Sequence, residues 1–504
     1  MSSPRYFRDV KQYIHVCSSN PPLDYLDHWI PLTPLEQMAR TDYDVIIVGT
    51  GAGGGAVLWR LCDKWRKGGK RIAVIERGDL LLPTHAMNLP TLNYERMIRF
   101  VENPKFKQPI TCHHTDLAIP LDFSQFFAFG GRTLYWGTGS PRFHPLDFQT
   151  WPFTYQELLP YYQIAERVMG VSQKFTQRST IQQNLLRRLR TIGYVEATDF
   201  PLAIDHNFRK NGLHLSAVFS SINLFAHALN VGAFDLAVNA RVVQVFTDKG
   251  TVVGVQVLTP SRKAYVIKGK IVVLAASTLE NPHILLCSGI QDESIGRYLV
   301  NHSWAETEGR LEFVHSEREI GNMAILVPRT HRQRYQVEIH LDQPYEYAPN
   351  IYGEIGNRDL RISMRGFGAV EPRYTNRVSL SPNQVDEYGI PKLAVHFTFS
   401  ERDLHVIQQM ISSMENQACG IGIHLIAPPC LKPPGRESHE SGTCRMGNNP
   451  HFSVTNQYGE LHQVSNLFVA DSSVLPYIGG TNPALTIVAV AIRTADYILH
   501  RLKN

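Results

Sequence analysis

A glycine-rich turn near the start of the chain constrains its fold more than any other feature. The apolar run at residues 43–48 leads into Gly49-Thr-Gly-Ala-Gly-Gly54, and a helical spacing of apolar residues follows. Gly49, Gly51 and Gly54 fit the pattern G-x-G-x-x-G, and Gly53 lies in the same loop. The first glycine makes the turn, the second lets the backbone approach a pyrophosphate, and the third lets the helix pack on the strand. The sequence therefore predicts a Rossmann-like α/β domain that binds a dinucleotide.

The next strand indicates which ribose this fold holds. Residues 72–76 form a second apolar run, as expected for the start of a strand–helix–strand unit. Glu76 ends this run 22 residues after Gly54, where an acid commonly binds the ribose hydroxyls. A carboxylate at that place favours a free ribose diol over a 2′-phosphate. Arg77 follows directly and is a further candidate contact.

The composition is that of an ordinary globular protein. Hydrophobic residues make up 43% and charged residues 19% of a 504-residue chain, a length that favours two domains. A net charge of +5 without a basic block argues against a nucleic-acid partner. We find no apolar stretch suited to a membrane span or a signal peptide, so we expect a cytoplasmic protein. The seven cysteines form no CxxC pair, which favours reduced thiols, and no metal site is expected.

The other elements are predicted from apolar spacing and from the positions of glycine and proline. We expect residues 90–150 to be mostly irregular and residues 303–400 to be strand-rich. The remaining predictions are helices at 151–168, 279–288, 402–417 and 483–502, and strands at 235–246, 252–259, 264–267, 270–276 and 467–470. The nucleotide-binding domain then comprises 42–150, 236–302 and 440–504, and the inserted α+β substrate-binding domain comprises 151–235 and 303–439. Residues 1–41 are expected to form an N-terminal extension.

Three further segments point to a family. They are Phe129-Gly-Gly-Arg-Thr-Leu-Tyr-Trp-Gly-Thr-Gly-Ser-Pro-Arg-Phe-His144, Ser438-His-Glu-Ser-Gly-Thr-Cys-Arg-Met-Gly447, and the stretch from Asn466 to Ile487. With the glycine turn, they resemble the glucose–methanol–choline (GMC) oxidoreductases, in order, from about residue 42 to the end. The segment from Phe129 to His144 is most similar to the pyranose oxidases and related glycoside oxidases. The resemblance implies FAD as the cofactor.

The resemblance also assigns contacts with that cofactor. The positions that match the family are Gly131, Thr133, Tyr135, Trp136, Gly137, Val242, Ala275, Asp471, Asn482 and Pro483. Several members tether the flavin through a histidine shortly after the Gly-Gly pair, and Tyr135 stands at that position here. Because a phenol cannot form a histidyl linkage, we predict non-covalent FAD.

Catalysis is expected in the carboxyl-terminal third of the chain. An alcohol must lose a proton from oxygen and a hydride from carbon, and the flavin takes the hydride. His439, in His-x-x-Gly-Thr, matches the family's catalytic base, and histidine suits proton transfer near neutral pH. Asn482, in Thr-Asn-Pro, matches its partner and can orient the substrate oxygen. The helix that starts at Pro483 would direct its positive dipole end toward the flavin.

These observations favour FAD-dependent oxidation of a CH–OH group to C=O, with a sugar or glycoside as substrate. Oxygen or another acceptor would then receive the electrons. One alternative is a dehydrogenase that uses a quinone or protein acceptor, or that acts on a sterol or lipid-like alcohol. A second is a lyase that keeps FAD without net redox chemistry. An oligomer is possible, and the sequence leaves its size open.

Overall fold

The computed structural model describes residues 28–502 apart from 67, 90, 92–93, 114–118, 178, 206–208, 211–212, 215–216, 312–321 and 342–359. The chain divides into two compact units, Met1–Leu32 and Thr33–Asn504. Residues 1–27 of the predicted N-terminal extension lie outside the described residues. The short helix α1 (Leu35–Met38) already belongs to the second unit, as do all elements described below.

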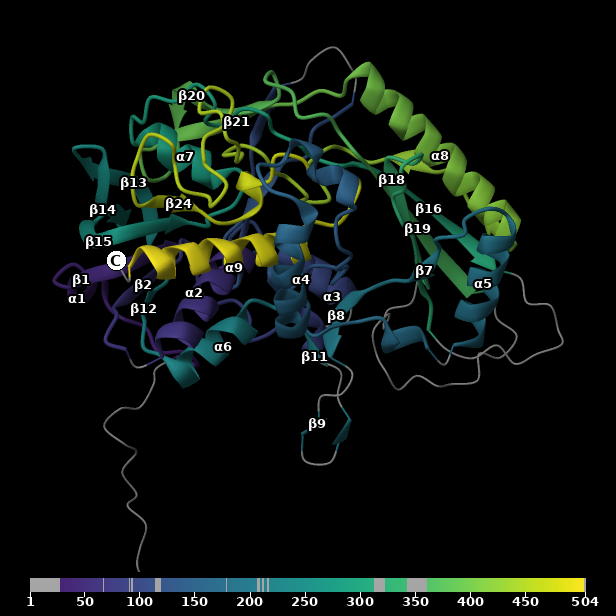
Figure 1. Ribbon diagram of the computed structural model, residues 1–504, viewed down its shortest axis with the longest axis horizontal. Coiled ribbons are helices and arrows are strands. Elements are labelled where there is room, and N and C mark those ends of the chain that lie inside the picture. The colour runs from purple at the N-terminus through teal and green to yellow at the C-terminus, as the bar shows by residue number, and fades with distance from the viewer. Residues whose placement is uncertain are drawn as a thin grey trace, which may run out of the picture. The chain divides into compact units, whose positions relative to one another are not determined.

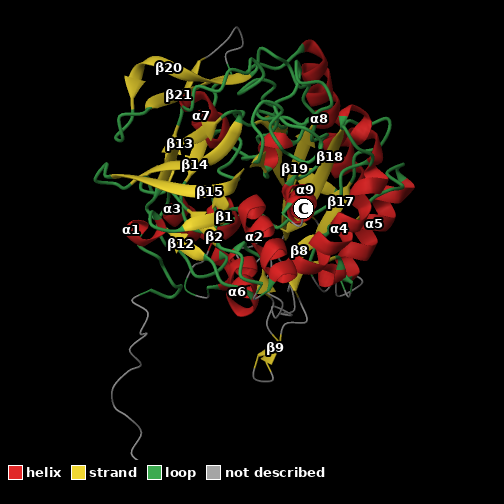
Figure 2. Ribbon diagram, turned by 60° about the vertical axis from the view of Figure 1, so that its left-hand side comes forward, coloured by secondary structure: helices red, strands yellow, loops and turns green. Residues whose placement is uncertain are grey.

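A mostly parallel sheet forms the core around the glycine turn (Figure 2). Its order is β12-β2-β1-β15-β14-β13, and β24 pairs with the end of β15. The strands are β1 (Asp42–Val48), β2 (Ile72–Ile75), β12 (Asp235–Ala237), β13 (Arg241–Asp248), β14 (Thr251–Leu258), β15 (Ala264–Leu274) and β24 (Leu467–Val469). Val45 of β1 lies opposite Ile72 on one side and Ile271 on the other, both in parallel register. These buried, β-branched parallel strands confirm the Rossmann-like α/β prediction.

Two predicted strand boundaries in this sheet were wrong. Residues 235–246, predicted as one strand, form β12 and β13 at opposite edges of the sheet. Asn239 lies between them at φ +52°, a left-handed conformation that apolar spacing does not report. Conversely, residues 264–267 and 270–276 belong largely to the single strand β15, because Gly269 continues the ladder opposite Tyr43.

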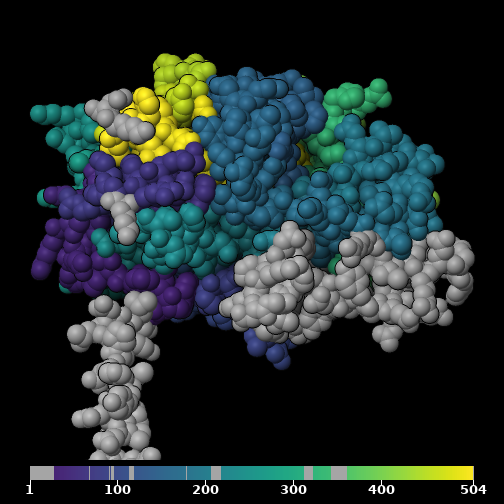
Figure 3. Space-filling model, turned by 60° about the horizontal axis from the view of Figure 1, so that its bottom comes forward, coloured from purple at the N-terminus to yellow at the C-terminus, as the bar shows by residue number. Residues whose placement is uncertain are grey.

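Helices from distant parts of the chain pack together beside this sheet. α2 (Ala52–Trp65) lies against α6 (Ile222–Val231) and α9 (Ala484–Arg501), and α9 also contacts α4 (Tyr155–Met169) (Figure 1). Arg60 of α2 donates two hydrogen bonds of 2.6 and 2.8 Å to Asp496 of α9, 436 positions away in the sequence. Figure 3 shows the corresponding contact between the purple and yellow segments of the surface. The beginning and end of this unit therefore form one layer.

Two helices begin at other residues than predicted. α4 begins at Tyr155 because Thr154 and Glu157 form a capping box, in which each accepts from the other's backbone N–H (3.3 and 2.7 Å). Pro483 is the N-cap of α9 and not its first residue, and its carbonyl accepts from Ile487 N–H at 2.9 Å. α7 (Glu280–Cys287) agrees with the predicted helix at 279–288.

A second, antiparallel sheet confirms that residues 303–400 are strand-rich. Its order is β22-β16-β19-β18-β17-β7, with β23 beside β16. The strands are β7 (Thr198–Asp199), β16 (Ser303–Leu311), β17 (Ala324–Val327), β18 (Tyr335–Leu341), β19 (Leu360–Gly368), β22 (Ile423–Leu425) and β23 (Cys430–Leu431). α5 (Thr180–Thr191) and α8 (Glu401–Ile421) cover one face of this sheet, with Leu185, Met410 and Met414 in the shared core (Figure 1). All seven residues of β18 are buried, so its other face is covered as well.

Residues 90–150 contain more regular structure than predicted. α3 (Tyr94–Val101), β3 (Lys107–Pro109), β4 (Thr111–His113) and β5 (Ser124–Phe126) lie there. β4 runs parallel to β21 (Pro391–His396), which pairs with β20 (Arg377–Val385). This small sheet joins two segments that the sequence assigned to different domains. Strands of three residues carry too short an alternation to be recognised beforehand.

Several two- to four-residue strands complete the described part of the unit. They are β6 (Val171–Ser172), β8 (Leu202–Asp205), β9 (Arg209–Lys210), β10 (Leu213–His214) and β11 (Ala217–Val218). The six cysteines among the described residues are free thiols. None of the helices in the described ranges is long and apolar enough to span a membrane.

Candidate active site

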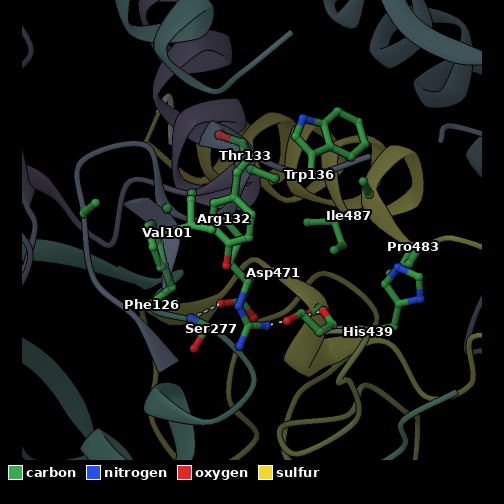
Figure 4. Close-up of a pocket in the computed structure, with 18 of the residues that line it drawn as sticks. Val101, Phe126, Arg132, Thr133, Trp136, Ser277, His439, Asp471, Pro483 and Ile487 are labelled. Carbon is green, nitrogen blue, oxygen red and sulfur yellow. Dashed lines mark hydrogen bonds between the residues drawn. The ribbon is translucent and has the colours of Figure 1, made fainter. Parts of the chain in front are cut away.

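One large cavity lies where the two sheets approach each other. Its volume is about 1080 Å³, slightly above the usual range for small-molecule sites. Figure 4 shows Val101 and Phe126 at one end, His439 and Pro483 at the other, and Ser277 and Asp471 along one wall. Of the residues predicted from sequence to bind or act on a ligand, all except Gly54 line this cavity. The fold therefore brings segments from the whole chain to one place.

The glycines of the turn differ in what surrounds them. Gly49 has φ +98°, and a Cβ there would lie 2.3 Å from the Ala275 carbonyl oxygen. A Cβ on Gly53 would lie 1.9 Å from the Ala470 carbonyl oxygen, and one on Gly54 2.0 Å from that of Gly49. A Cβ on Gly51 would meet no protein atom within 4 Å.

Gly51 therefore faces open space, whereas its neighbours pack against backbone. Gly51 is also the N-cap of α2, so the unpaired N–H groups of the first helical turn begin beside it. An open cradle at a helix N-terminus fits an anionic pyrophosphate. The observation suits the dinucleotide predicted from the sequence, and the glycine contacts themselves stay predictions.

Glu76 is buried and organises the turn. Its carboxylate accepts from Thr50 N–H (3.1 Å), Thr50 Oγ1–H (2.6 Å) and Gly78 N–H (2.7 Å). Burial raises the pKa of Glu76 above its usual value, and these hydrogen bonds oppose the rise. A carboxylate can accept about four hydrogen bonds, so room for a ribose hydroxyl is left. The ribose contact remains a prediction, and the turn-forming role is an additional finding.

Arg77 follows at the same end of the cavity. Its Nη1 donates to Glu280 at 2.9 Å, and its guanidinium lies 3.7 Å from the centre of the Phe127 ring. The side chain is thus paired and stacked, and its charge is balanced before any ligand binds.

The second glycine turn is tied to the first. Thr50 Oγ1 accepts from Gly130 N–H at 2.9 Å, and a Cβ on Gly131 would lie 3.2 Å from Gly51 Cα. Gly131 has φ +55° and starts a short 3-10 helix, Gly131–Leu134. Thr133 Oγ1 donates to the Gly130 carbonyl at 2.6 Å, which closes this turn. The two loops consequently form one wall of the cavity.

Tyr135 and Trp136 continue this wall. The Tyr135 ring packs edge-on against Phe126 at 4.8 Å, and burial raises the pKa of Tyr135 to about 12, so the phenol stays neutral. Trp136 Nε1 donates to the Phe219 carbonyl at 2.9 Å, which holds the indole in place. Gly137 lines the cavity next to them.

Three predicted contacts lie at strand ends. Val242 is at the start of β13 and Ala275 just after β15, where its N–H donates to Val48 at 2.8 Å. The Asp471 carboxylate accepts from Ser277 N–H, Asn281 Nδ2, Ser473 N–H and Ser473 Oγ at 2.6 to 2.9 Å. The side chain of Asp471 is therefore fully engaged, which leaves its backbone as the part open to a ligand.

His439 lies at the opposite end of the cavity from the α3 segment and has a partner that the sequence did not reveal. Its Nδ1 is 3.1 Å from Nδ1 of His302, and the two rings meet edge to face. A hydrogen must lie between these two nitrogens, because two acceptors cannot form a hydrogen bond. Burial, followed by the neighbouring His302 and Arg132, holds the pKa of His439 well below 6.5. The imidazole is thus neutral at physiological pH, with Nε2 as its remaining nitrogen.

Asn482 is positioned by a chain of buried polar groups on β18. Gln336 Nε2 donates to Asn482 Oδ1 at 2.6 Å and to Glu338 Oε1 at 2.8 Å, and His340 lies 3.4 Å from Glu338. Because its oxygen is occupied, Asn482 can present its amide N–H group, which lies beside Gly139 of the cavity wall. The sequence pattern could have indicated these hydrogen-bonded side chains, since Gln336, Glu338 and His340 are alternate residues of one strand and lie on the same face.

Next to these polar residues of β18, the cavity wall is aromatic and charged. Trp304 and Phe367 lie nearly parallel, with ring centres 6.3 Å apart and planes 14° apart. Glu306 pairs with Lys432 at 3.2 Å and with Arg365 at 3.6 Å. These side chains come from β16, β19 and the segment after β23, which sequence reasoning placed in the substrate domain without naming a site.

Comparison with known proteins settles the family. Residues 127–304 match the amino-terminal domain of the GMC oxidoreductases and residues 372–491 the carboxyl-terminal domain. The chain belongs to the GMC oxidoreductases. It is therefore an oxidoreductase of the class that acts on CH–OH donors. The family implies FAD, and the open cradle at Gly51 fits that cofactor.

Relatives of this GMC oxidoreductase act on several alcohols. It is 26% identical to a 2-methyl-1,2-propanediol dehydrogenase of Mycolicibacterium austroafricanum, over 92% of this chain and 96% of the relative. It is 27% identical to a paromamine 6′-oxidase of Streptomyces fradiae (90% and 91%) and 26% identical to a C-glycoside 3-oxidase of Arthrobacter globiformis (74% and 74%). The predicted likeness to glycoside oxidases is confirmed.

The fold is shared with solved structures. A formate oxidase of Aspergillus oryzae, studied for the modification of its FAD, superimposes with a TM-score of 0.68 at 14% identity, over 92% of this chain and 99% of that one.

Proposed function

We propose that this GMC oxidoreductase oxidises an alcohol group of a sugar or glycoside with non-covalently bound FAD. The observation that carries the proposal is that His439 and Asn482 line the same cavity as the glycine turn. When bound, FAD supplies the acceptor for the hydride that leaves the alcohol carbon. The chain's own residues must then bind the substrate and remove the hydroxyl proton.

His439 is the proposed base. It is partly buried in the cavity wall, and its pKa is held well below the usual value, so the ring is unprotonated and able to accept a proton. With Nδ1 directed at His302, the proton would be taken up at Nε2. A positioned base of this kind contributes about 10²- to 10⁴-fold to a rate.

Asn482 is the proposed partner of the substrate oxygen. Gln336 holds its Oδ1, which leaves the Nδ2 hydrogens to donate to the oxygen as negative charge develops there. The same contact fixes the amide orientation before the substrate arrives. An amide cannot act as a second base, so the proton is assigned to His439 alone.

A sugar or glycoside suits the remaining wall. Glu338 and His340 offer donors and acceptors for hydroxyl groups, and Trp304 with Phe367 offers an apolar surface. Relatives that act on paromamine and on C-glycosides support the same substrate class. Tyr135 at the usual tether position supports non-covalent FAD.

A dehydrogenase is the second candidate. The relative from Mycolicibacterium austroafricanum covers 92% of this chain and is a dehydrogenase of a small diol. The electron acceptor separates the two candidates, because an oxidase consumes oxygen and a dehydrogenase requires an artificial acceptor in the assay.

The test is anaerobic mixing of the purified flavoprotein with sugars, glycosides, small diols and sterols, followed through flavin absorbance. We expect bleaching with a sugar or glycoside, and a loss of about 10²- to 10⁴-fold in its rate for His439→Ala with FAD still bound. His405→Ala, on the exposed face of α8, controls for removal of a histidine. Normal reduction by His439→Ala contradicts the assignment, and turnover without bleaching indicates a lyase. Release of the flavin on acid precipitation tests the non-covalent binding.

A further inference from the structure

Arg132 forms hydrogen bonds with the residues on both sides of His439. Arg132, in the 3-10 helix after the second glycine turn, donates from Nη1 to Glu440 Oε2 at 2.5 Å and to the Ser438 carbonyl at 3.3 Å. Its Nη2 donates to Glu440 Oε1 at 3.3 Å and to the Ser124 carbonyl at 2.6 Å. The guanidinium therefore holds the residue before His439 and the residue after it. Arg132 and Glu440 are 308 positions apart in the sequence.

The backbone at His439 needs such a support. Ser438 has φ +61°, a left-handed conformation that costs energy for a residue other than glycine. Such conformations persist only where surrounding contacts enforce them. On the other side, Thr278 Oγ1 donates to the Glu440 carbonyl at 2.8 Å, and Ser441 pairs with Val300 through two backbone hydrogen bonds. The contacts on the Ser438 side include Arg132 and a 3.3 Å bond from its own N–H to Gly435.

The same guanidinium acts on the imidazole through its charge. Arg132 is one of the groups that lower the pKa of His439, after burial and His302. Two carboxyl groups lie in the same region: Glu440 is paired with Arg132, and burial raises the pKa of Glu437 well above its usual value, so Glu437 stays neutral. The charge that opposes protonation of His439 is therefore that of Arg132, balanced in part by Glu440.

We propose that Arg132 is a positioning residue for His439, which sets the place of the imidazole through Ser438 and Glu440 and keeps it unprotonated. The proposal rests on the proposed role of His439 as base. Arginine suits the task because its planar fork reaches two acceptors in fixed directions and always carries its charge. A lysine could supply the charge without the fork. The two effects can therefore be separated by substitution.

The test compares Arg132→Lys and Arg132→Met in the FAD-loaded enzyme. We expect both variants to slow flavin reduction by about 10- to 100-fold, as for a misplaced catalytic group. Only Arg132→Met should move the acidic limb of the pH profile to higher pH. Removing a nearby positive charge raises the pKa of His439, so a higher pH is then needed to keep it neutral. Arg132→Lys should keep the wild-type midpoint.

A second readout does not depend on turnover. Hydrogen exchange of the peptide that spans residues 436–443 should become faster in Arg132→Met. Arg60→Met is the matched control, since Arg60 also makes a two-pronged, partly buried pair, with Asp496, away from the cavity. It should change neither the pH midpoint nor the exchange of that peptide.

Three results would overturn the proposal. They are a wild-type rate and pH midpoint in Arg132→Met, unchanged exchange at 436–443, or the same changes in Arg60→Met. If no alcohol reduces the wild-type flavin, the proposed function fails. The exchange experiment then still decides whether Arg132 holds the segment.

Discussion

Replacing His302 with leucine should slow flavin reduction while the protein keeps its fold. His302 is completely buried, and its Nδ1 lies 3.1 Å from Nδ1 of His439. Leucine fills similar space beside Phe367 but offers no hydrogen-bonding atom. The substitution therefore leaves His439 Nδ1 without its hydrogen-bond partner.

The size of the effect follows from that lost partner. An unsatisfied buried polar group costs about 1–3 kcal/mol. At about 1.36 kcal/mol per factor of ten, this corresponds to roughly a 5- to 160-fold slower step if the whole cost falls on the transition state. A further loss comes from the tautomer, because only a neutral ring with hydrogen on Nδ1 can accept a proton at Nε2.

The assay is anaerobic stopped-flow reduction of the bound flavin at several substrate concentrations. We expect the limiting rate to fall and the substrate concentration at half-saturation to change little, because His439 lines the cavity and His302 does not. His302→Asn is the conservative control, since its Oδ1 can replace Nδ1 as acceptor and should restore much of the rate. A wild-type limiting rate in His302→Leu would refute the reasoning, as would equal losses in the leucine and asparagine variants.

Two other predictions concern the cofactor cradle and acid stability. Gly53→Ala should destabilise the fold by about 1–3 kcal/mol, because its Cβ would lie 1.9 Å from the Ala470 carbonyl oxygen. Gly51→Ala should keep its stability and lose FAD affinity, because a Cβ there would have no protein atom within 4 Å. Thermal unfolding measures the first effect, and FAD titration measures the second. His85 is buried, with Nδ1 accepting from Met87 N–H and Nε2 facing the Trp136 carbonyl, and burial lowers its pKa to about 4. A depressed histidine pKa means that the unfolded chain binds the proton first, so stability should fall from pH 6.5 toward pH 4, by roughly 3 kcal/mol for this group. Urea unfolding of His85→Asn across that range should show a shallower pH dependence than wild type, and an unchanged dependence would contradict the assignment.

Local patterns explain how much of the fold was predictable. The strand at β1, the glycine turn and the start of α2 depend on residues close together in sequence, so spacing alone identified them. The split of residues 235–246 into β12 and β13 depended on a single left-handed residue, Asn239, and on strand pairing at two distant edges. Within residues 90–150, β4 depends on pairing with the distant strand β21, whereas β3 and β5 pair with each other and are each only three residues long.

The candidate site divides in the same way. By resemblance, the sequence alone named His439, Asn482 and the glycines of the cradle, because each stands in a short motif with its own chemistry. Only the tertiary structure brought Arg132, His302 and Gln336 to them, since these contacts join residues 137 to 308 positions apart. The sequence around an arginine or a buried histidine does not indicate which distant residue it will contact. Long-range packing alone decides that partner.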